Sequence, residues 1–247
     1  MTTNQRPPYH WGIIAPARGD EAGETDGRTE SLLPPEVITL SNVLGIRDYT
    51  SEGVEEAMAR YPDCVRDLVR RGAQRVTLNG IPISVQLGRP RVLAFIEDSH
   101  KNFGVPADTA GEAVVAAMQH LGVSKIAVGS RWADEVNNAL IRYLADAGIE
   151  VLAMTSRGQW AQQAFSMSVE MGVKLAFELG REAMRQAPEA EALFLPGGAW
   201  RPLPAVPILE EDYGKPVFTN KNTQTWRLIH DGIAPPVHGW GRLLATP

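Results

Sequence analysis

The chain has almost no cysteine, because Cys64 is the only one among its 247 residues. A single cysteine excludes an intramolecular disulfide and a metal site built from several thiolates. At this length roughly 70–75% of the surface of the unfolded chain is buried on folding, so no disulfide or metal is needed as a staple. These features predict a reduced protein of the cytoplasmic type.

The chain also lacks long apolar runs and an excess of basic residues. No run of about 18 uncharged apolar residues is present, and a membrane-spanning helix requires one. The N-terminal segment MTTNQRPPYHW has no continuous apolar stretch, which a secretory signal would need. The net charge is −5, without the basic clustering typical of nucleic-acid-binding surfaces. We therefore expect neither a membrane nor a nucleic acid as a partner, but a small molecule.

Several well-known catalytic motifs are absent. The sequence contains no GxSxG, Walker A or GxGxxG motif, so neither a serine-hydrolase elbow nor a nucleotide cradle is predicted. Its five histidines have no H-x-x-x-H or similar ligand spacing, and no zinc site is expected. Only His238, beside Gly239 and Trp240, is kept as a candidate site histidine. Cys64 lies within a predicted helix and is interpreted as a structural residue.

Short apolar runs followed by longer amphipathic stretches recur along the chain. This alternation is typical of βα units and a parallel sheet, and it predicts an α/β fold. Strands are expected at 10–16, 36–42, 74–79, 124–130, 150–155, 191–196 and 215–220. Helices are expected at 53–71, 109–121, 133–147, 160–186 and 222–231, with Thr109 as an N-cap and Gly172 or Gly180 as possible kinks.

Two segments are similar enough to suggest two related halves. LGVSKIAVGS (121–130) and RGAQRVTLNG (71–80) each contain a helix end, a glycine turn and a strand. Segment 18–30 carries five acidic and two basic residues with three glycines, which predicts a solvated loop. Its functional alternatives are a lid over the site or a cation site, although the acidic spacing does not match an EF-hand.

Candidate ligand-binding residues are those that follow the predicted strands. In an open parallel sheet, ligands bind at the carboxyl ends of strands, where helix N-termini offer unpaired N–H groups to anions. The alternative interpretation is that these residues are turn glycines and helix caps. The segments are Pro16; Asn79, Gly80, Ile81 and Pro82; Ser130, Arg131 and Trp132; Pro196, Gly197 and Gly198; and Asn220, Lys221 and Asn222.

The same segments carry a family resemblance. WGIIAP, RGAQRVTLNGIPIS, SRWADEVNNAL, FLPGGAWRPLPAVPILEEDYGKPVFTNKNTQTW and HGWGRLL resemble the arylmalonate decarboxylase and maleate isomerase branch of the aspartate/glutamate racemase superfamily. The resemblance implies two pseudo-symmetric lobes, each a mostly parallel sheet flanked by helices, with the active site in the cleft between them. It also implies no metal and no organic cofactor, and it makes a homo-oligomer possible. We expect 1–108 with 216–247 to form the first lobe, and 109–215 the second.

This chain departs from the family pattern at the reactive positions. Members of the superfamily commonly place a cysteine at a strand end in each lobe, and the decarboxylases keep only the second. Here the first position corresponds to Gly80 and the second to Pro196, and neither side chain can transfer a proton. Further replacements affect residues expected to hold the substrate. Ile81 and Pro82 stand where hydroxyls are expected, Trp132 replaces a tyrosine, and Asn220-Lys221-Asn222 replaces Ser-Asn-Gln.

The leading hypothesis is a cofactor-independent enzyme that acts on a small carboxylate or carbonyl compound without cysteine. Decarboxylation, isomerisation or lyase chemistry would pass through an enolate-like intermediate. Backbone N–H groups near Gly80 and Gly197-Gly198 would stabilise the oxyanion. Lys221 is the candidate acid/base, because the pKa of a lysine falls readily on burial.

The remaining candidates have supporting roles. Arg131 would supply positive charge, and Trp132 and Trp200 would form an apolar wall, with core packing as the alternative for both tryptophans. Asn79, Asn220 and Asn222 would orient the substrate. Two other functions stay open: a hydrolase of the same fold with an asparagine-positioned water, and a small-molecule-binding protein without catalysis.

Overall fold

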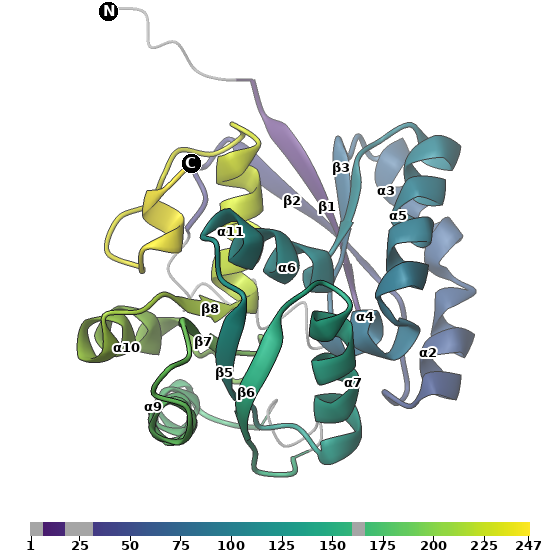
Figure 1. Cartoon of the computed structure of the whole chain (residues 1–247). Coiled ribbons are helices and arrows are strands. Elements are labelled where there is room, and N and C mark those ends of the chain that lie inside the picture. The colour runs from purple at the N-terminus through teal and green to yellow at the C-terminus, as the bar shows by residue number, and fades with distance from the viewer. Residues whose placement is uncertain (1–6, 18–31, 160–165) are drawn as a thin grey trace, which may run out of the picture.

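The computed structural model describes residues 7–17, 32–159 and 166–247. It contains two four-stranded sheets whose strands are all parallel to their neighbours (Figure 1). The first has the order β2-β1-β3-β4 and the second the order β6-β5-β7-β8, so the two lobes have the same topology. The strands are β1 (Tyr9–Ala15), β2 (Val37–Val43), β3 (Arg75–Leu78), β4 (Ala107–Thr109), β5 (Lys125–Gly129), β6 (Glu150–Thr155), β7 (Ala192–Leu195) and β8 (Val217–Thr219). The predicted α/β fold with two pseudo-symmetric lobes is confirmed.

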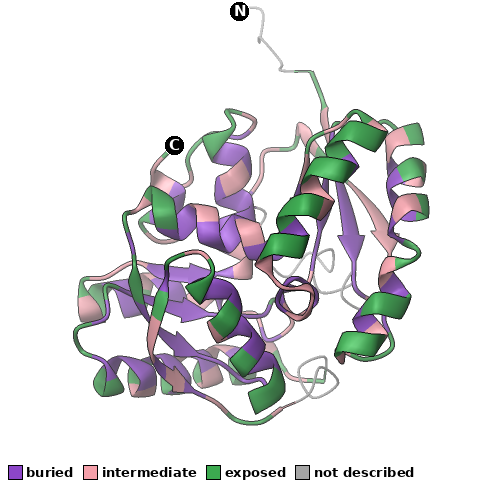
Figure 2. Ribbon diagram, turned by 45° about the vertical axis from the view of Figure 1, so that its right-hand side comes forward, coloured by how far each residue is buried: buried purple, intermediate pink, exposed green. Residues whose placement is uncertain are grey.

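Helices flank both sheets, with one side of each buried and the other exposed (Figure 2). Those that follow the first three strands are α2 (Ser51–Met58), α3 (Tyr61–Arg70), α4 (Ile81–Leu87) and α5 (Arg89–Phe103). Those of the second lobe are α7 (Asp134–Ala145), α9 (Val169–Gln186) and α10 (Val206–Tyr213). Short 3₁₀ helices lie at Leu203–Ala205 and Leu243–Ala245. No helix in the described part of the chain is long and apolar enough to cross a membrane.

Two further helices lie side by side where the lobes meet (Figure 1). α6 (Ala110–His120) follows β4, and α11 (Asn220–His230) follows β8. Each begins after a threonine N-cap, Thr109 or Thr219, whose hydroxyl accepts a hydrogen bond from the backbone N–H three residues later. The predicted N-cap at Thr109 is confirmed, and the equivalent cap at Thr219 strengthens the pseudo-symmetry of the two halves.

The helix predicted over 53–71 is instead two helices, α2 and α3. Its apolar spacing is preserved, and both Val54 and Leu68 are buried. The break lies at Ala59 and Arg60, directly before Pro62 in the first turn of α3. Proline lacks an N–H and clashes with the preceding turn, so it occupies the start of a helix rather than its interior.

Two other differences concern short elements and glycines. β4 is not in the set of predicted strands, because its three residues, Ala-Asp-Thr, form no apolar run, unlike the Val-Phe-Thr of the equally short β8. α9 begins at Val169, and the predicted residues 160–165 lie outside the described part. Gly172 and Gly180 serve close packing, since a Cβ at Gly172 would collide with the carbonyl of Trp200 and one at Gly180 would lie 2.9 Å from Leu193 Cδ2.

The predicted lobe boundary at 215/216 differs from the sheet pairing at one strand. β8 is hydrogen-bonded to β7 and is therefore part of the second sheet, although 216–247 was expected in the first lobe. The helix that follows it does reach the first lobe, where Gln224 bonds to Asn79 and Arg75 pairs with Asp231. The segment 18–30, expected to be a loop or lid, lies outside the described residues.

Candidate functional site

Two glycines occupy equivalent positions at the carboxyl ends of β3 and β7, which hold the same place in their sheets. Gly80 is the second residue after β3, and Gly197 is the second residue after β7. Their φ angles are +94° and +95°, a backbone conformation that favours glycine. Pro196, expected to be the counterpart of Gly80, therefore lies one residue too early. The structural counterpart is Gly197, and neither position carries a side chain.

Neighbouring side chains leave little room beside these glycines. A Cβ at Gly80 would lie 2.7 Å from Pro16 Cγ, and one at Gly197 would lie 3.2 Å from Trp132 Cζ2 and 3.4 Å from Trp200 Nε1. Both tryptophans are buried, and the Trp200 indole N–H donates to the Pro196 carbonyl at 2.9 Å. The structure thus brings Trp132 and Trp200 together at Gly197, and Pro16 at Gly80.

The backbone donors of the two glycine turns differ in availability. The N–H of Gly197, predicted to stabilise an oxyanion, donates instead to Asn220 Oδ1 at 2.9 Å. No acceptor among the described residues takes a hydrogen bond from the N–H of Gly80 or of Gly198. The predicted anion site therefore loses Gly197 as a donor, while Gly80 and Gly198 retain theirs.

Helix α11 contacts the residues that follow both strands. Asn220 lies in its first turn and bonds to Gly197 beyond β7. One turn later, Gln224 Nε2 donates to Asn79 Oδ1, beyond β3, at 2.5 Å. Both Asn79 and Gln224 are buried. Gln224 was not among the predicted site residues, although its i, i+4 spacing from Asn220 places both on one helical face.

Three predicted site residues have structural roles. Asn222 is fully buried and completes a capping box, in which its Oδ1 accepts from Thr219 and its Nδ2 donates to the Val217 carbonyl at 2.8 Å. Ser130 donates to Asn137 Oδ1 at 2.6 Å and accepts from the Trp132 N–H at 3.0 Å. Ile81 belongs to the main hydrophobic cluster with no exposed surface. Caps and core residues already have partners, so these three do not face a ligand.

The charged candidates differ in burial. Arg131 is 3% exposed, and its backbone carbonyl accepts from the Gln159 N–H at 2.7 Å. Lys221 is partly buried in the first turn of α11 and pairs with no carboxylate in the described residues. Pro82 is partly buried at the start of α4, and His238 is exposed in the C-terminal segment. Lys221 directly follows Asn220 at the start of α11.

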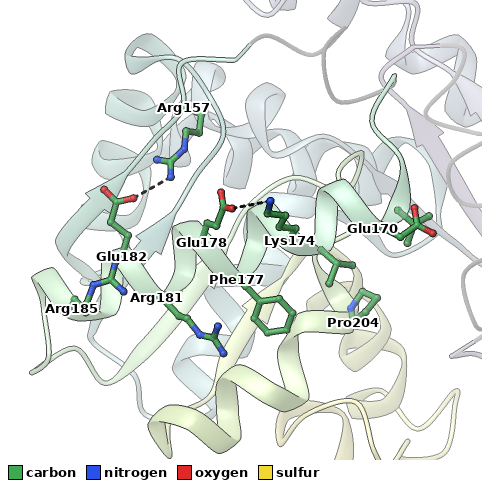
Figure 3. Close-up of a pocket in the computed structure, with 11 residues that line it drawn as sticks. Arg157, Glu170, Lys174, Phe177, Glu178, Arg181, Glu182, Arg185 and Pro204 are labelled. Atoms are coloured by element: carbon green, nitrogen blue, oxygen red, sulfur yellow. Dashed lines mark hydrogen bonds and ion pairs between the residues drawn. The ribbon is translucent and has the colours of Figure 1, made fainter.

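The structure also has a surface groove of about 890 Å³ along α9 (Figure 3). It includes the partly buried Phe177 ring and none of the predicted site residues. Four of the charged residues beside it form ion pairs, with Arg157 bonded to Glu182 at 3.2 Å and Lys174 near Glu178 at 3.9 Å. We assign the chemistry to the strand ends instead. In the described ranges, no group of three or more His, Cys, Asp or Glu residues could hold a metal ion.

Comparison with known proteins relates this geometry to a family. The family model for arylmalonate decarboxylase matches residues 12–244, nearly the whole chain. The chain belongs to the arylmalonate decarboxylase family. Arylmalonate decarboxylase of Bordetella bronchiseptica is 27% identical over 233 residues, which cover 94% of each protein.

Solved structures agree with this assignment. A liganded mutant of arylmalonate decarboxylase superposes with a TM-score of 0.82 at 26% identity, covering 96% of this chain and 98% of the other. The maleate isomerase of Pseudomonas putida S16 with bound maleate has a TM-score of 0.78 at 16% identity, covering 96% and 97%. The second similarity concerns the fold alone.

Neither strand end of this chain carries a thiol, since Gly80 and Gly197 occupy the two equivalent positions. Its single cysteine is buried on α3, with Cys64 Sγ 3.6 Å from the Val43 carbonyl. Burial raises the pKa of the Cys64 thiol above its ordinary value. A thiol that is both buried and protonated is inert, so the structural interpretation of Cys64 agrees with its position.

Thiol chemistry is expected to be slow in the folded protein. A thiolate, not a thiol, attacks disulfide reagents, so Cys64 should react with DTNB at least about tenfold more slowly in the native than in the urea-unfolded chain. The absorbance of the released thionitrobenzoate measures both rates. Equal rates would show that Cys64 is accessible and would reopen a role for it.

Proposed function

We propose that this chain is a cofactor-independent enzyme that acts on a small carboxylate of the arylmalonate type by a cysteine-free route. The observation that carries the proposal is the equivalence of Gly80 and Gly197, which share a φ near +95° and are both linked to α11 through its first turns. Such paired glycine turns leave backbone N–H groups open to an anion. The available donors are those of Gly80 and Gly198.

The apolar part of the substrate would lie against tryptophan. Trp132 and Trp200 flank Gly197, and their ring atoms come within 3.5 Å of the position that a Cβ on Gly197 would occupy. A planar ring stacks favourably on an indole face, which suits an aryl or branched alkyl substituent. Pro16 and Pro82 would border the opposite turn, and Arg131 would add positive charge that favours a dianionic substrate.

The chemistry requires one bond cleavage and one proton transfer. The bond between the α-carbon and one carboxylate breaks, carbon dioxide leaves, and the electron pair remains as an enediolate. The N–H groups of Gly80 and Gly198 would stabilise the negative oxygens. The Lys221 ammonium would donate its proton to the α-carbon, and solvent would then reprotonate the amine.

The hydrolase alternative has weaker support. A water that attacks a carbonyl needs an acceptor for its proton, and asparagine could offer only its Oδ1. The Oδ1 atoms of Asn79, Asn220 and Asn222 each accept a hydrogen bond from the protein. A second candidate, binding without catalysis, is favoured by one observation: both Gly80 and Gly197 lack a reactive side chain.

Incubation with phenylmalonate in deuterium oxide separates these functions. The proposed enzyme should release carbon dioxide and form phenylacetate with one deuterium at the α-carbon, detected by NMR and mass spectrometry. Maleate and simple amides serve as comparison substrates for isomerisation and hydrolysis. Unchanged phenylmalonate that nevertheless raises the Tm would reject catalysis in favour of binding. If phenylmalonate is not turned over and also leaves the Tm unchanged, the proposed substrate class is rejected.

A further inference from the structure

One face of α11 carries four polar residues that contact both lobes. Asn220, Gln224, Arg227 and Asp231 follow the spacing i, i+4, i+7 and i+11, which lines them up along a helix. Asp231 is the residue that caps the C-terminal end of α11. The four residues are called the α11 stripe below.

The stripe is anchored firmly in the first lobe. Arg75, in β3, forms an ion pair with Asp231, and Arg227 Nε lies 3.4 Å from Asp108 Oδ2 in β4. Asp108 is buried, so its carboxylate lies away from bulk water, whereas Asp231 at the end of the helix is exposed. The C-terminal half of α11 is therefore fixed to the two strands of the first sheet that lie nearest to it.

The other half of the stripe contacts the two glycine turns. Gln224 donates to Asn79, the residue before Gly80, and Asn220 accepts from the N–H of Gly197. Four residues along a helix correspond to a rise of about 6 Å, which is comparable with the size of a small dicarboxylate. Because a helix resists stretching, the two contacts are held at a constant separation.

We infer that Asn220 and Gln224 are positioning residues that hold the two glycine turns at a set separation, so that the turns of both lobes move as one unit. The purpose of that separation, binding one carboxylate ligand from both sides, rests on the proposed function. The mechanical link itself does not, because it needs only the two hydrogen bonds and the α11 stripe.

Burial makes the link stiff. Gln224 and Asn79 are 6% and 7% exposed, and a hydrogen bond between buried amides is costly to leave unmade. If Gln224 loses its amide, Asn79 Oδ1 loses that donor and the first turns of α11 can shift. Asn220 lies on the same face and would shift with them, which would weaken its bond to Gly197.

Hydrogen–deuterium exchange of the full chain without ligand tests the link. In Gln224→Met, which keeps the length of the side chain, amides of 197–201 should exchange about three- to tenfold faster, although the Gln224 side chain donates to Asn79, beside the other turn. Reciprocally, Asn220→Ala should accelerate exchange at 79–84. Amides of β5 report global unfolding, so a uniform loss of protection can be recognised and subtracted.

Thr223→Val is the matched control. Thr223 is on the same helix and also buried, and among the described residues its hydroxyl bonds to the carbonyls of Thr219 and Asn220, within α11 and its cap. Thr223→Val should leave amide exchange in both glycine turns unchanged. If Gln224→Met accelerates only the turn it touches, or if Thr223→Val has the same remote effect, the positioning role is rejected. Gln224→Glu, with a protonated carboxyl as donor at acidic pH, provides a second variant should Gln224→Met not fold.

This outcome is independent of the phenylmalonate experiment. Linked exchange together with no turnover would support the positioning role and reject the enzyme. If the two turns exchange independently and phenylmalonate is turned over, the enzyme is supported and the positioning role is rejected.

Discussion

Replacing Lys221 with methionine is expected to lower the turnover of phenylmalonate by about 10²- to 10⁴-fold, the usual contribution of a positioned acid. Methionine keeps much of the apolar stem but has no proton to donate. Turnover is measured as phenylacetate formed, and circular dichroism confirms that the variant is folded. Lys174, exposed on α9 and outside the strand ends, supplies the control, because Lys174→Met should retain full turnover.

Lys221→Arg separates the two ways in which lysine could act. Arginine keeps the positive charge but does not release its proton in proteins, so substrate binding should persist while turnover falls as far as in Lys221→Met. Equal turnover in Lys221→Arg and wild type would assign Lys221 an electrostatic role. Wild-type turnover in Lys221→Met would remove lysine from the mechanism.

The parts of the fold that could be predicted are those whose signals are local. Each β-strand of five or more residues was found from its apolar run, within one residue at each end. The helices expected at 109–121 and 133–147 end within two residues of the predicted positions, ahead of Gly122 and Gly148, whose φ angles are left-handed. β4 was missed because its residues, Ala-Asp-Thr, form no apolar run. The break before Pro62 was also missed, because the apolar spacing continues across it even though proline at that point favours a new helix.

The site was less predictable, because its contacts join residues far apart in sequence. Asn79 and Gln224 are 145 positions apart, and no local pattern pairs them. The sequence could place Asn220, Lys221 and Asn222 at the start of a helix. It could not reveal that Asn222 points into the cap while Asn220 reaches the Gly197 N–H. Pro196 was assigned as the partner of Gly80, but Gly197 holds the equivalent position. Gly80 and Gly197 are each the second residue after their strand, and the exact ends of β3 and β7 come from the structure.

The second large effect is expected in the ionic cluster that holds the C-terminal half of α11 against β3 and β4. Arg75 is 11% exposed, pairs with Asp231, and has its Nη1 3.7 Å from Asp108 Oδ2. Arg75→Met should lower the free energy of unfolding at neutral pH by about 1.5–3 kcal/mol, because it removes the cation bonded to Asp231 and one of the cations beside the buried Asp108 carboxylate, which keeps Arg227. Urea unfolding followed by circular dichroism measures the change. Arg91, whose ion pair with Glu55 is exposed, gives the control, since Arg91→Met should cost at most about 1 kcal/mol.

The pH dependence of that loss identifies its cause. Burial raises the pKa of Asp108 above its ordinary value, and the nearby Arg227 opposes this. A carboxyl with a raised pKa in the folded state binds its proton more tightly there than in the unfolded chain, so its contribution to stability falls as pH rises through that pKa. Removing Arg75 takes away one of the opposing charges and enlarges the effect. The deficit of Arg75→Met should therefore shrink as the pH is lowered and Asp108 is protonated.

A double mutant decides whether charge or packing is responsible. Asp108→Asn in the Arg75→Met background removes the buried charge while preserving shape, and it should restore much of the lost stability at neutral pH, since replacing both members of a buried pair is often nearly neutral. If the double mutant is as unstable as Arg75→Met alone, and the deficit does not change with pH, Arg75 stabilises the seam between the lobes through its aliphatic stem. Its charge would then be incidental to how α11 is held against β3.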